Sequence, residues 1–526
     1  MTLNDLLLAT TRRSRQRAAM VYFGQSISYS QFLEEVERAA CGLQSIGVRR
    51  GDRVALLLQN CPQFAIGYFA ALRCGAIVTS TSPIYTSREV SHQWKDAGVR
   101  VAIVDEVLRI VVEGARSSCP GLERIVWTQS NAYKRPSARR LKEYGRTSPK
   151  EISQATQDLD WGNLLSYGRR PSPVIVRPRD VACLQYTGGT TGVSKGAMLT
   201  HANLVINAEQ TCGWLTGGKV RRETMIAALP LFHIYATTCV MISAIFCGGT
   251  VIILPRFELS EVLKVVRKYR PTLFHGVPTM YVAFNGVANL RRYGFHRLRT
   301  CMSGGAPLPV AVQQQFELRT GAKLVEGYGL TESSPVTHIN PLGKSRAGSI
   351  GVAVPRTQAR IVDLKRGLRE LPIGEAGELI IKGPQVMKGY WRKSKETAHA
   401  LRKGWLFTGD IARVDPDGFY YIADRKKDLI LVGGFNVYPR EVEEVLFEHP
   451  AIKEAAVVGV PDGYRGESVK AFVVCRPGMS ASVEEIISFS RERLAAYKVP
   501  RAIEFLDSLP RSGVGKYLRR ELRKPK

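Results

Sequence analysis

The 526-residue sequence lacks the cysteine patterns of metal sites and disulfide frameworks. Its ten cysteines stand alone, without a Cys-x-x-Cys pair or a His/Cys cluster of metal-ligand spacing. Several are in apolar surroundings, such as Cys74, Cys183 and Cys239, which is typical of reduced core residues. A secretory signal is also missing, because the short apolar run 6–9 precedes its arginines instead of following them. We therefore predict a cytoplasmic protein.

Acidic residues are scarce relative to basic ones. The 46 Asp and Glu residues oppose 75 Lys and Arg residues, which gives a net charge of +29. Nucleic acid, an anionic membrane surface or acidic substrates would each suit this excess. We expect no nucleic acid, because zinc-finger spacing, heptads behind a basic region and a Gly/aromatic RNA-binding signature are all missing. Solvated basic faces and a peripheral position on an anionic membrane both stay open.

One long stretch, residues 224–255, has no charged residue and is long enough to span a bilayer. Pro230, His233, the Gly248-Gly249 pair and the β-branched run 250–253 argue against a membrane helix. We expect a strand, a loop, a buried helix and a second strand instead.

The most distinctive stretch begins after the apolar run 181–184. It concentrates hydroxyls, glycines and one lysine: Thr187, Gly188, Gly189, Thr190, Thr191, Gly192, Ser194, Lys195 and Gly196. Glycines let backbone N–H groups turn toward one anion, and hydroxyls and an ammonium add donors, so the pattern favours a polyphosphate. A Walker A loop is excluded because Gly196, not Ser or Thr, follows Lys195. A flexible linker and a hydrolase elbow at Ser194 are weaker alternatives, since ordered segments flank the loop and its threonines and glycines suit phosphate better.

This loop resembles the phosphate loop of the adenylate-forming enzymes, which include acyl-CoA synthetases, peptide adenylation domains and luciferase. Later motifs follow that family's order over almost the whole chain, and the likeness is greatest to bacterial long-chain fatty acyl-CoA synthetases. The resemblance implies an α/β protein with a large N-terminal domain of several subdomains, residues 1–425, that binds ATP and the acyl group. A small, mobile α+β domain, residues 426–526, would follow.

Local patterns agree with that fold. Alternating strands and helices in the first part predict a parallel α/β layer, with a helix within 26–45, a strand at 53–58, a helix at 61–73 and strands at 76–79 and 101–104. A strand over 227–234 would end near His233, and two more strand-to-turn junctions follow at 273–279 and 299–306. In the last part we expect helices at 439–449 and 483–494 and strands at 454–459 and 469–475.

Several motifs match nucleotide-binding segments of the family. The resemblance assigns ATP or AMP contacts to Thr187, Gly188, Gly189, Thr190, Thr191, Gly192, Lys195, Gly304, Gly305, Glu326, Gly327, Tyr328, Gly329, Asp410 and Arg425. The residue types suit these contacts, because glycines around Tyr328 admit a flat base and the paired acceptors of Asp410 suit two ribose hydroxyls. Thr331 would donate to a phosphate and count as catalytic, and Glu332 is a hard oxygen ligand for Mg²⁺ on ATP.

Other assignments rest on the resemblance more heavily. His233 matches a position beside the acyl pocket and becomes a catalytic candidate, although a lone histidine among apolar residues is more often a core group. Lys427 would be the hinge, and Gly433 and Gly434 would bind CoA. Lys516 would be the catalytic lysine, although a basic tail is by itself usually a solvated charge run.

The resemblance implies an AMP-forming acid–thiol ligase that joins a medium- or long-chain fatty acid to CoA through an acyl-adenylate, with ATP, CoA and Mg²⁺. Aryl- and dicarboxylic-acid CoA ligases, and a ligase that loads a carrier protein, stay as alternatives within the family. A basic membrane- or nucleic-acid-binding protein with a degenerate nucleotide fold is the non-enzyme alternative. A monomer and a homodimer are equally compatible with the sequence.

Overall fold

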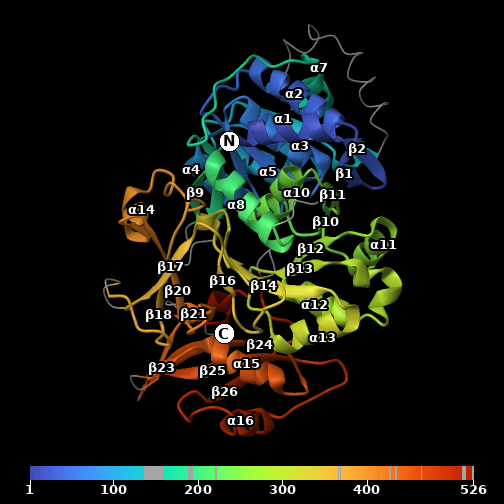
Figure 1. Cartoon of the computed structure of the whole chain (residues 1–526). Coiled ribbons are helices and arrows are strands. Elements are labelled where there is room, and N and C mark those ends of the chain that lie inside the picture. The colour runs from blue at the N-terminus through green and yellow to red at the C-terminus, as the bar shows by residue number, and fades with distance from the viewer. Residues whose placement is uncertain are drawn as a thin grey trace.

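The computed structural model describes residues 1–134, 158–187, 194–218, 222–364, 367, 369–425, 428–432, 435–463, 465–511 and 517–523. Four β-sheets and their helices occupy successive parts of the molecule, from the N-terminal end at the top of Figure 1 to the C-terminal end at the bottom.

The first sheet has seven strands. Their order is β7 (Leu159–Asp160), β6 (Arg124–Thr128), β5 (Val99–Asp105), β3 (Arg53–Leu57), β4 (Ile77–Ser80), β8 (Val181–Thr187) and β9 (Lys195–Thr200). Every pair is parallel except β8 and β9, which form an antiparallel pair. Val54 and Leu56 face one core while Ala55 and Leu57 face another, so the sheet is buried on both sides, as parallel sheets are. The predicted parallel α/β layer is confirmed.

Helices cover both faces of this sheet. One face packs on α4 (Ser87–Ala97) and α5 (Arg109–Arg116), and the other on α3 (Pro62–Arg73), with α1 (Leu3–Ser14), α2 (Tyr29–Ser45) and α7 (Trp161–Ser166) outside it. The predicted amphipathic helix is α2, whose N-terminus is closed by a capping box between Ser28 and Gln31. Its apolar side chains Phe32, Val36 and Leu43 are buried at helical spacing.

The second sheet has nine strands. Their order is β16 (Val352–Ala353), β15 (Val336–Ile339), β14 (Lys323–Gly329), β13 (Thr300–Ser303), β12 (Leu273–Gly276), β10 (Thr224–Ala227), β11 (Thr250–Ile253), β1 (Ala18–Tyr22) and β2 (Gln25–Ser28). Strands β1, β11, β10, β12, β13 and β14 are consecutive in this sheet and run parallel, so their carboxyl ends meet at one edge. Open α/β sheets bind ligands at such edges.

Helices and 3₁₀ turns flank the second sheet. They are α8 (His201–Leu215), α9 (Ile234–Ala236), α10 (Ser243–Cys247), α11 (Leu259–Tyr269), α12 (Pro278–Asn285), η4 (Leu290–Tyr293), η5 (Phe295–Arg297), α13 (Val310–Thr320) and η6 (Thr331–Ser333), together with the π-helix η3 (Thr237–Ile242). Phe274 of β12 packs edge-on against Tyr281 and Phe284 of α12, which covers one face. The ring of Phe316 from α13 contacts Tyr281 in the same aromatic cluster.

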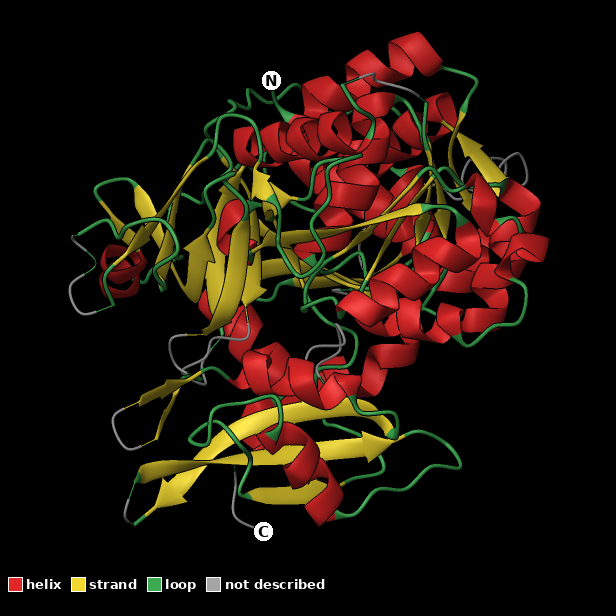
Figure 2. Ribbon diagram, turned by 60° about the horizontal axis from the view of Figure 1, so that its bottom comes forward, coloured by secondary structure: helices red, strands yellow, loops and turns green. Residues whose placement is uncertain are grey.

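The third sheet and the C-terminal unit complete the chain. The third sheet contains β17 (Gln358–Val362), β18 (Gly377–Lys382), β19 (Leu401–Arg402), β20 (Trp405–Val414) and β21 (Tyr420–Arg425), beside α14 (Ser394–Ala400). The C-terminal unit contains β22 (Ile430–Val432), β23 (Phe435–Val437), α15 (Pro439–Glu448), β24 (Ile452–Asp462), β25 (Gly466–Cys475), α16 (Val483–Arg491), β26 (Ala502–Phe505) and α17 (Arg519–Leu522). It forms a separate α+β layer at one end of the molecule (Figure 2), as predicted.

The uncharged stretch 224–255 folds as two strands with a helical segment between them, as predicted. Within the described ranges, no helix combines the length and the apolarity needed to cross a bilayer.

The prediction that a strand runs over 227–234 is wrong. Strand β10 ends at Ala227, and the chain then turns, so that His233 becomes the N-cap of α9. Pro230 has no N–H group with which to continue the hydrogen bonding of the strand. The side chain of Asn60 accepts a hydrogen bond from the N–H of Leu231 and donates one to the carbonyl of Leu229, which holds the turn.

Candidate functional site

The antiparallel pair β8–β9 holds the ends of the predicted phosphate loop. Thr187 and Lys195 are its last register pair, and both are half-buried. Residues 188–193, which include Gly188, Gly189, Thr190, Thr191 and Gly192, lie outside the described residues. A Cβ atom at Gly196 would lie 3.1 Å from the ring of Tyr186, so glycine lets the two strands close tightly.

A second segment fastens this hairpin to the predicted metal ligand. The N–H of Trp391 donates to the carbonyl of Gly196 over 2.8 Å. The Tyr390 hydroxyl donates to Oε1 of Glu332 over 2.7 Å, and Nζ of Lys195 lies 5.5 Å from the centre of the Tyr390 ring. Lys195 and Glu332, 137 residues apart in sequence, are therefore brought to the same side chain.

Sequence reasoning did not select Tyr390 as a site residue. Burial, reinforced by the Glu332 carboxylate, raises the pKa of the Tyr390 hydroxyl, so this group stays protonated and donates. Tyr390 ends the run 383–390, which also resembles the family's sequence, but that resemblance says nothing of its contacts.

The predicted adenine segment lies at the end of β14 and is joined to the predicted ribose ligand. The Tyr328 hydroxyl donates to Oδ2 of Asp410 over 2.5 Å. Asp410 is buried on β20 and lies opposite Arg425 of β21 in the ladder. Gly329 has no alternative residue, because a Cβ atom there would lie 2.0 Å from the carbonyl oxygen of Pro335.

Thr331 and Glu332 belong to η6, directly after this segment, and both are half-buried. The carbonyl of Glu332 accepts a hydrogen bond from the N–H of Met387 over 2.7 Å. This contact ties η6 to the segment that carries Tyr390. In the described part of the chain, three or more His, Cys, Asp or Glu side chains do not converge as a metal-binding group.

Glu326 differs from the other predicted nucleotide residues because its side chain is buried. Its Oε2 atom has no hydrogen-bond partner among the described residues, and the carboxyl group is 4% exposed. Burial raises the pKa of Glu326 to about 7, against the opposing charge of Arg440. Its backbone carbonyl accepts from the N–H of Asn340.

Gly304 and Gly305 follow β13 and meet the loop that carries His233. The N–H of Gly304 donates to the carbonyl of Gly276 over 3.1 Å. A Cβ atom at Gly304 would lie 3.2 Å from the ring of Tyr235 and 3.3 Å from the carbonyl oxygen of Gly327. These glycines let the tyrosine ring lie directly on the sheet edge.

His233 is half-buried and its Nδ1 atom accepts the N–H of Tyr235 over 3.3 Å. The preceding carbonyl, that of Phe232, accepts a hydrogen bond from Gln185 on β8. The structure therefore brings His233 between the phosphate hairpin and the Gly304 turn.

Some predicted residues cannot be placed. Lys427, Gly433, Gly434 and Lys516 lie outside the described residues, and only the backbone of Arg425 is described.

The residues that flank segment 512–516 are held together. Arg511 and Tyr517 form a β-bridge, and the N–H of Leu518 donates to the carbonyl of Pro510. These contacts bring both ends of the segment to one place in the C-terminal unit.

An ionic network links the C-terminal unit to the preceding sheet. Nη2 of Arg519 lies 2.7 Å from Oε2 of Glu443, and Nη1 lies 3.6 Å from Asp424 and 3.8 Å from Asp428. Asp424 is on β21, whereas Glu443 is on α15, so one guanidinium joins both parts of the molecule. Burial makes such a network costly to break.

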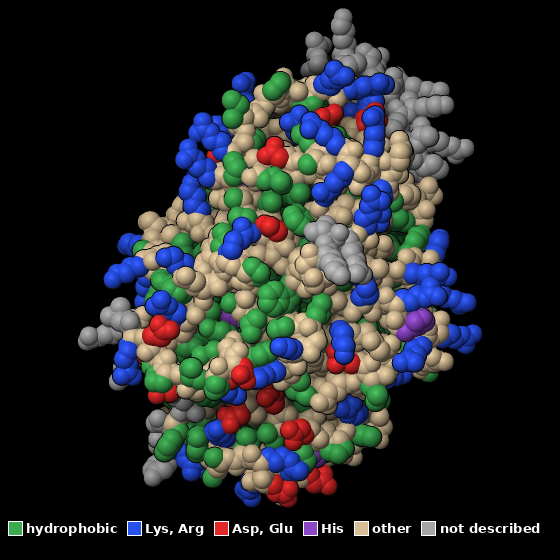
Figure 3. Space-filling view, in the orientation of Figure 1, with side chains coloured by type: hydrophobic (Ala, Val, Ile, Leu, Met, Phe, Trp, Pro, Cys, Tyr) green, Lys and Arg blue, Asp and Glu red, His purple; other side chains and the backbone are tan. Residues whose placement is uncertain are grey.

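Basic side chains are spread over the molecular face in Figure 3 rather than gathered in one stripe. Acidic side chains are fewer, and apolar side chains are interspersed among them. This distribution of basic side chains does not by itself indicate a binding site for one extended polyanion.

Comparison with known proteins identifies the family of the chain. The model of the AMP-binding enzymes matches residues 7–391, and that of the AMP-binding enzyme C-terminal domain matches residues 441–516. A long-chain-fatty-acid–CoA ligase of Bacillus subtilis is 44% identical, with 99% of this chain and 94% of the relative aligned.

Solved structures agree over the whole chain. The ATP-bound MatB of Rhodopseudomonas palustris has a TM-score of 0.86 at 29% identity and covers 99% of this chain and 98% of its own. A benzoate CoA ligase of Burkholderia xenovorans has a TM-score of 0.87 at 26% identity, with both chains fully covered. The matched models, the identity over nearly the full length and the shared architecture show that this chain belongs to the family of AMP-binding, adenylate-forming enzymes.

Proposed function

We propose that the protein is an ATP-dependent CoA ligase for medium- and long-chain fatty acids. The observation that carries this proposal is the meeting of Lys195 and Glu332 at Tyr390, beside the contact of Tyr328 with Asp410. These side chains supply a cation, a hard oxygen ligand, an aromatic face and a carboxylate, which suit a nucleoside triphosphate. The 44% identity to a fatty-acid–CoA ligase supports the choice of acid.

The first half-reaction joins two anions. A carboxylate oxygen of the acid attacks the α-phosphorus of ATP, the bond to the β-phosphate oxygen breaks, and pyrophosphate leaves with the electron pair. Catalysis of such a step is mainly alignment and charge neutralisation. We assign these roles to Lys516, to Lys195 with the hydroxyl of Thr331, and to the backbone of Gly304 and Gly305. His233 would border the reacting carboxylate.

The residues at the nucleotide edge fit a magnesium ion. Mg²⁺ binds through one or two carboxylates plus substrate phosphates, and Glu332 offers a half-buried carboxylate that Tyr390 orients. When bound there with ATP, the ion would offset phosphate charge. Tyr328 would lie against the adenine, and Asp410 and Arg425 would hold the ribose.

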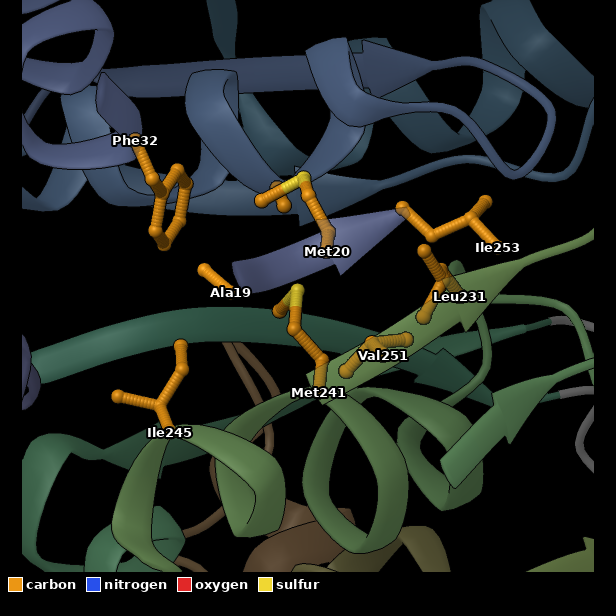
Figure 4. Close-up of a pocket in the computed structure, with 9 residues that line it drawn as sticks. Ala19, Met20, Phe32, Leu231, Met241, Ile245, Val251 and Ile253 are labelled. Atoms are coloured by element: carbon orange, nitrogen blue, oxygen red, sulfur yellow. The ribbon is translucent and has the colours of Figure 1, made fainter. Parts of the chain in front are cut away.

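The acyl chain requires apolar space beyond His233. Nine apolar side chains line an internal cavity of about 20 Å³, and five of them come from the uncharged stretch 224–255: Leu231, Met241, Ile245, Val251 and Ile253. Figure 4 shows these side chains between strand β1, the helix that carries Phe32 and the helical segment with Met241 and Ile245. We infer that this cavity receives the methyl end of the chain, where each buried CH₂ contributes about 0.8 kcal/mol.

The second half-reaction transfers the acyl group to CoA. The thiol sulfur attacks the acyl carbonyl, AMP leaves, and the thiol proton goes to solvent. We propose that residues 426–526 rotate about Lys427 between the two half-reactions. Lys516 would then move out of the active site, and Gly433 and Gly434 would leave room for the pantetheine arm of CoA. The Arg519 network would hold the first arrangement.

We also propose a cytoplasmic enzyme that attracts its substrate, or an anionic membrane surface, through its net charge of +29. Sedimentation with vesicles of phosphatidylcholine, with and without phosphatidylglycerol, tests the membrane part. Equal sedimentation with both would leave only diffuse attraction to anionic substrates.

The test of the function is a panel of carboxylic acids assayed for AMP release with and without CoA. We expect kcat/KM to rise with aliphatic chain length to a cutoff, and AMP release to require CoA for turnover. Benzoate or ferulate outperforming dodecanoate would favour the aryl-acid alternative, which the structural likeness to a benzoate CoA ligase keeps relevant.

A further inference from the structure

One buried histidine on the acyl side stands out for its hydrogen bonding. His275 of β12 is 1% exposed, and neither ring nitrogen has a partner among the described residues. Two other buried histidines each have at least one partner, since Nδ1 of His201 accepts from the N–H of Leu3 and Nδ1 of His338 pairs with the hydroxyl of Thr337, although Nε2 of His338 has none among the described residues. Leaving a buried polar group unpaired is unfavourable, so such a group is usually explained by a ligand or a water molecule.

The sheet register places His275 on the face that carries the candidate acyl site. His275 lies opposite Met302 of β13, whereas the next pair, Gly276 and Ser303, faces the other side. A Cβ atom at Gly276 would contact Tyr281 of α12, so that other side is filled by aromatic rings.

The ring of Tyr235 joins His275 to the Gly304 turn. The Tyr235 and His275 rings meet edge to face with their centres 6.0 Å apart. The Tyr235 hydroxyl donates to the carbonyl of Met302 over 3.0 Å, and the same ring covers Gly304. His275 is therefore next to the turn where we place the reacting end of the acid, one residue before the end of its strand.

The imidazole at this position is neutral at physiological pH. Burial lowers the pKa of His275 to about 4, and no charged group contributes to the shift. A neutral imidazole offers one N–H donor and one acceptor nitrogen. The thioether of Met302 and the edge of the Tyr235 ring do not satisfy both.

We propose that His275 recognises a hydroxyl group near the carboxyl end of the acyl chain, so that the preferred substrates are hydroxylated fatty acids. A hydroxyl group can both donate and accept a hydrogen bond, which matches the donor N–H and the acceptor nitrogen of the neutral ring. The proposal rests on the proposed fatty acyl-CoA ligase activity and narrows its substrate class. His275 would act as a specificity residue and take no part in bond making.

The experiment compares dodecanoate with the hydroxydodecanoates that carry the hydroxyl on the second, third or fourth carbon. We would measure kcat/KM for each acid with the wild-type enzyme, His275→Leu and His275→Asn. The wild type should favour one isomer over dodecanoate by about tenfold or more, since a site that pairs a hydroxyl discriminates strongly against its absence. Leucine should abolish or reverse the ratio, and asparagine should keep part of it.

The ratio of the kcat/KM values of two acids on one enzyme does not change when part of the protein is unfolded. It therefore separates a loss of recognition from general damage to the protein. His275→Leu should also unfold at an equal or higher temperature, because it removes an unpaired polar group from the interior. No preference in the wild type, as expected if an internal water is the sole partner, would overturn the proposal. So would an unchanged preference in His275→Leu.

Failure of the underlying function is distinguishable. If neither dodecanoate nor any hydroxy isomer supports CoA-dependent AMP release while benzoate does, both proposals fall. If dodecanoate is used well and the isomers are not preferred, only the role of His275 falls.

Discussion

The nucleotide side of the candidate site joins polar side chains from distant parts of the chain, whereas its acyl side is mostly apolar and includes His233 and the buried His275. Tyr328 meets Asp410 and Tyr390 meets Glu332 through hydrogen bonds of 2.5 and 2.7 Å. On the acyl side, the ring of Tyr235 meets the His275 imidazole edge to face, and neither ring nitrogen has a hydrogen-bond partner among the described residues. Polar groups that are already paired with one another suit a ligand that never varies, such as ATP. An unpaired polar group can instead select among acids, because only an acid with a matching polar group pairs with it.

The strongest test of the nucleotide side is Lys516→Ala. Loss of one preorganised cation should lower the rate of acyl-adenylate formation about a hundredfold or more. Thioester formation from supplied acyl-adenylate should change far less, because Lys516 would by then have moved away. Pyrophosphate release and acyl-CoA formation would be followed separately.

Lys453→Ala, at an exposed lysine of the same unit, is the matched control and should leave both rates unchanged. Near wild-type adenylation in Lys516→Ala would make Lys516 an ordinary surface lysine.

Glu326 of β14 tests the cost of burying a carboxyl group. Its pKa is raised from 4.5 to about 7 in the folded protein, so the folded state binds more protons than the unfolded state between these values. The free energy of unfolding should therefore fall as pH rises from about 4.5 to 7, by at most about 3 kcal/mol from this group.

Glu326→Gln should remove that part of the pH dependence, which denaturant unfolding at several pH values would measure. Arg440 is the opposing charge, so Arg440→Ala should raise the pKa of Glu326 further and extend the decline to higher pH. Identical pH profiles for wild type and Glu326→Gln would contradict the assignment.

Tyr390→Phe is a smaller change on the nucleotide side. It keeps the ring beneath Lys195 and removes only the hydroxyl that orients Glu332. Loss of one hydrogen bond to a charged group should reduce kcat/KM for Mg·ATP about tenfold, with little effect on KM for the acid. Initial rates at varied Mg²⁺ and ATP provide the measurement, and an equal loss for the acid would indicate a general disturbance.

Met241→Phe makes the mildest change and acts on the acyl side. The larger side chain should fill the cavity of about 20 Å³ and lower the preferred chain length by about one or two carbons. Activity on a short acid such as octanoate should be retained, which serves as the internal control. An unchanged cutoff over a series of chain lengths would place the methyl end elsewhere.

Sequence patterns predicted much of the architecture because the signals were local. The apolar run at residues 54–57 and the helical spacing of the apolar residues in α2 are local patterns that the sequence already contains. The extent of β10 was missed, because its end depends on Asn60 binding the turn around Pro230 from a distant part of the chain.

Residue types and their spacing were enough to recognise the family, the glycine-rich loop and the order of the motifs. The folded structure was needed to show which side chains meet: Tyr390 with Glu332 and Lys195, Tyr328 with Asp410, and Arg519 across the junction. It also shows that neither ring nitrogen of His275 has a hydrogen-bond partner among the described residues. Contacts between residues far apart in sequence depend on how the sheets pack. A buried group can be recognised as unpaired only when all its neighbours in space are known.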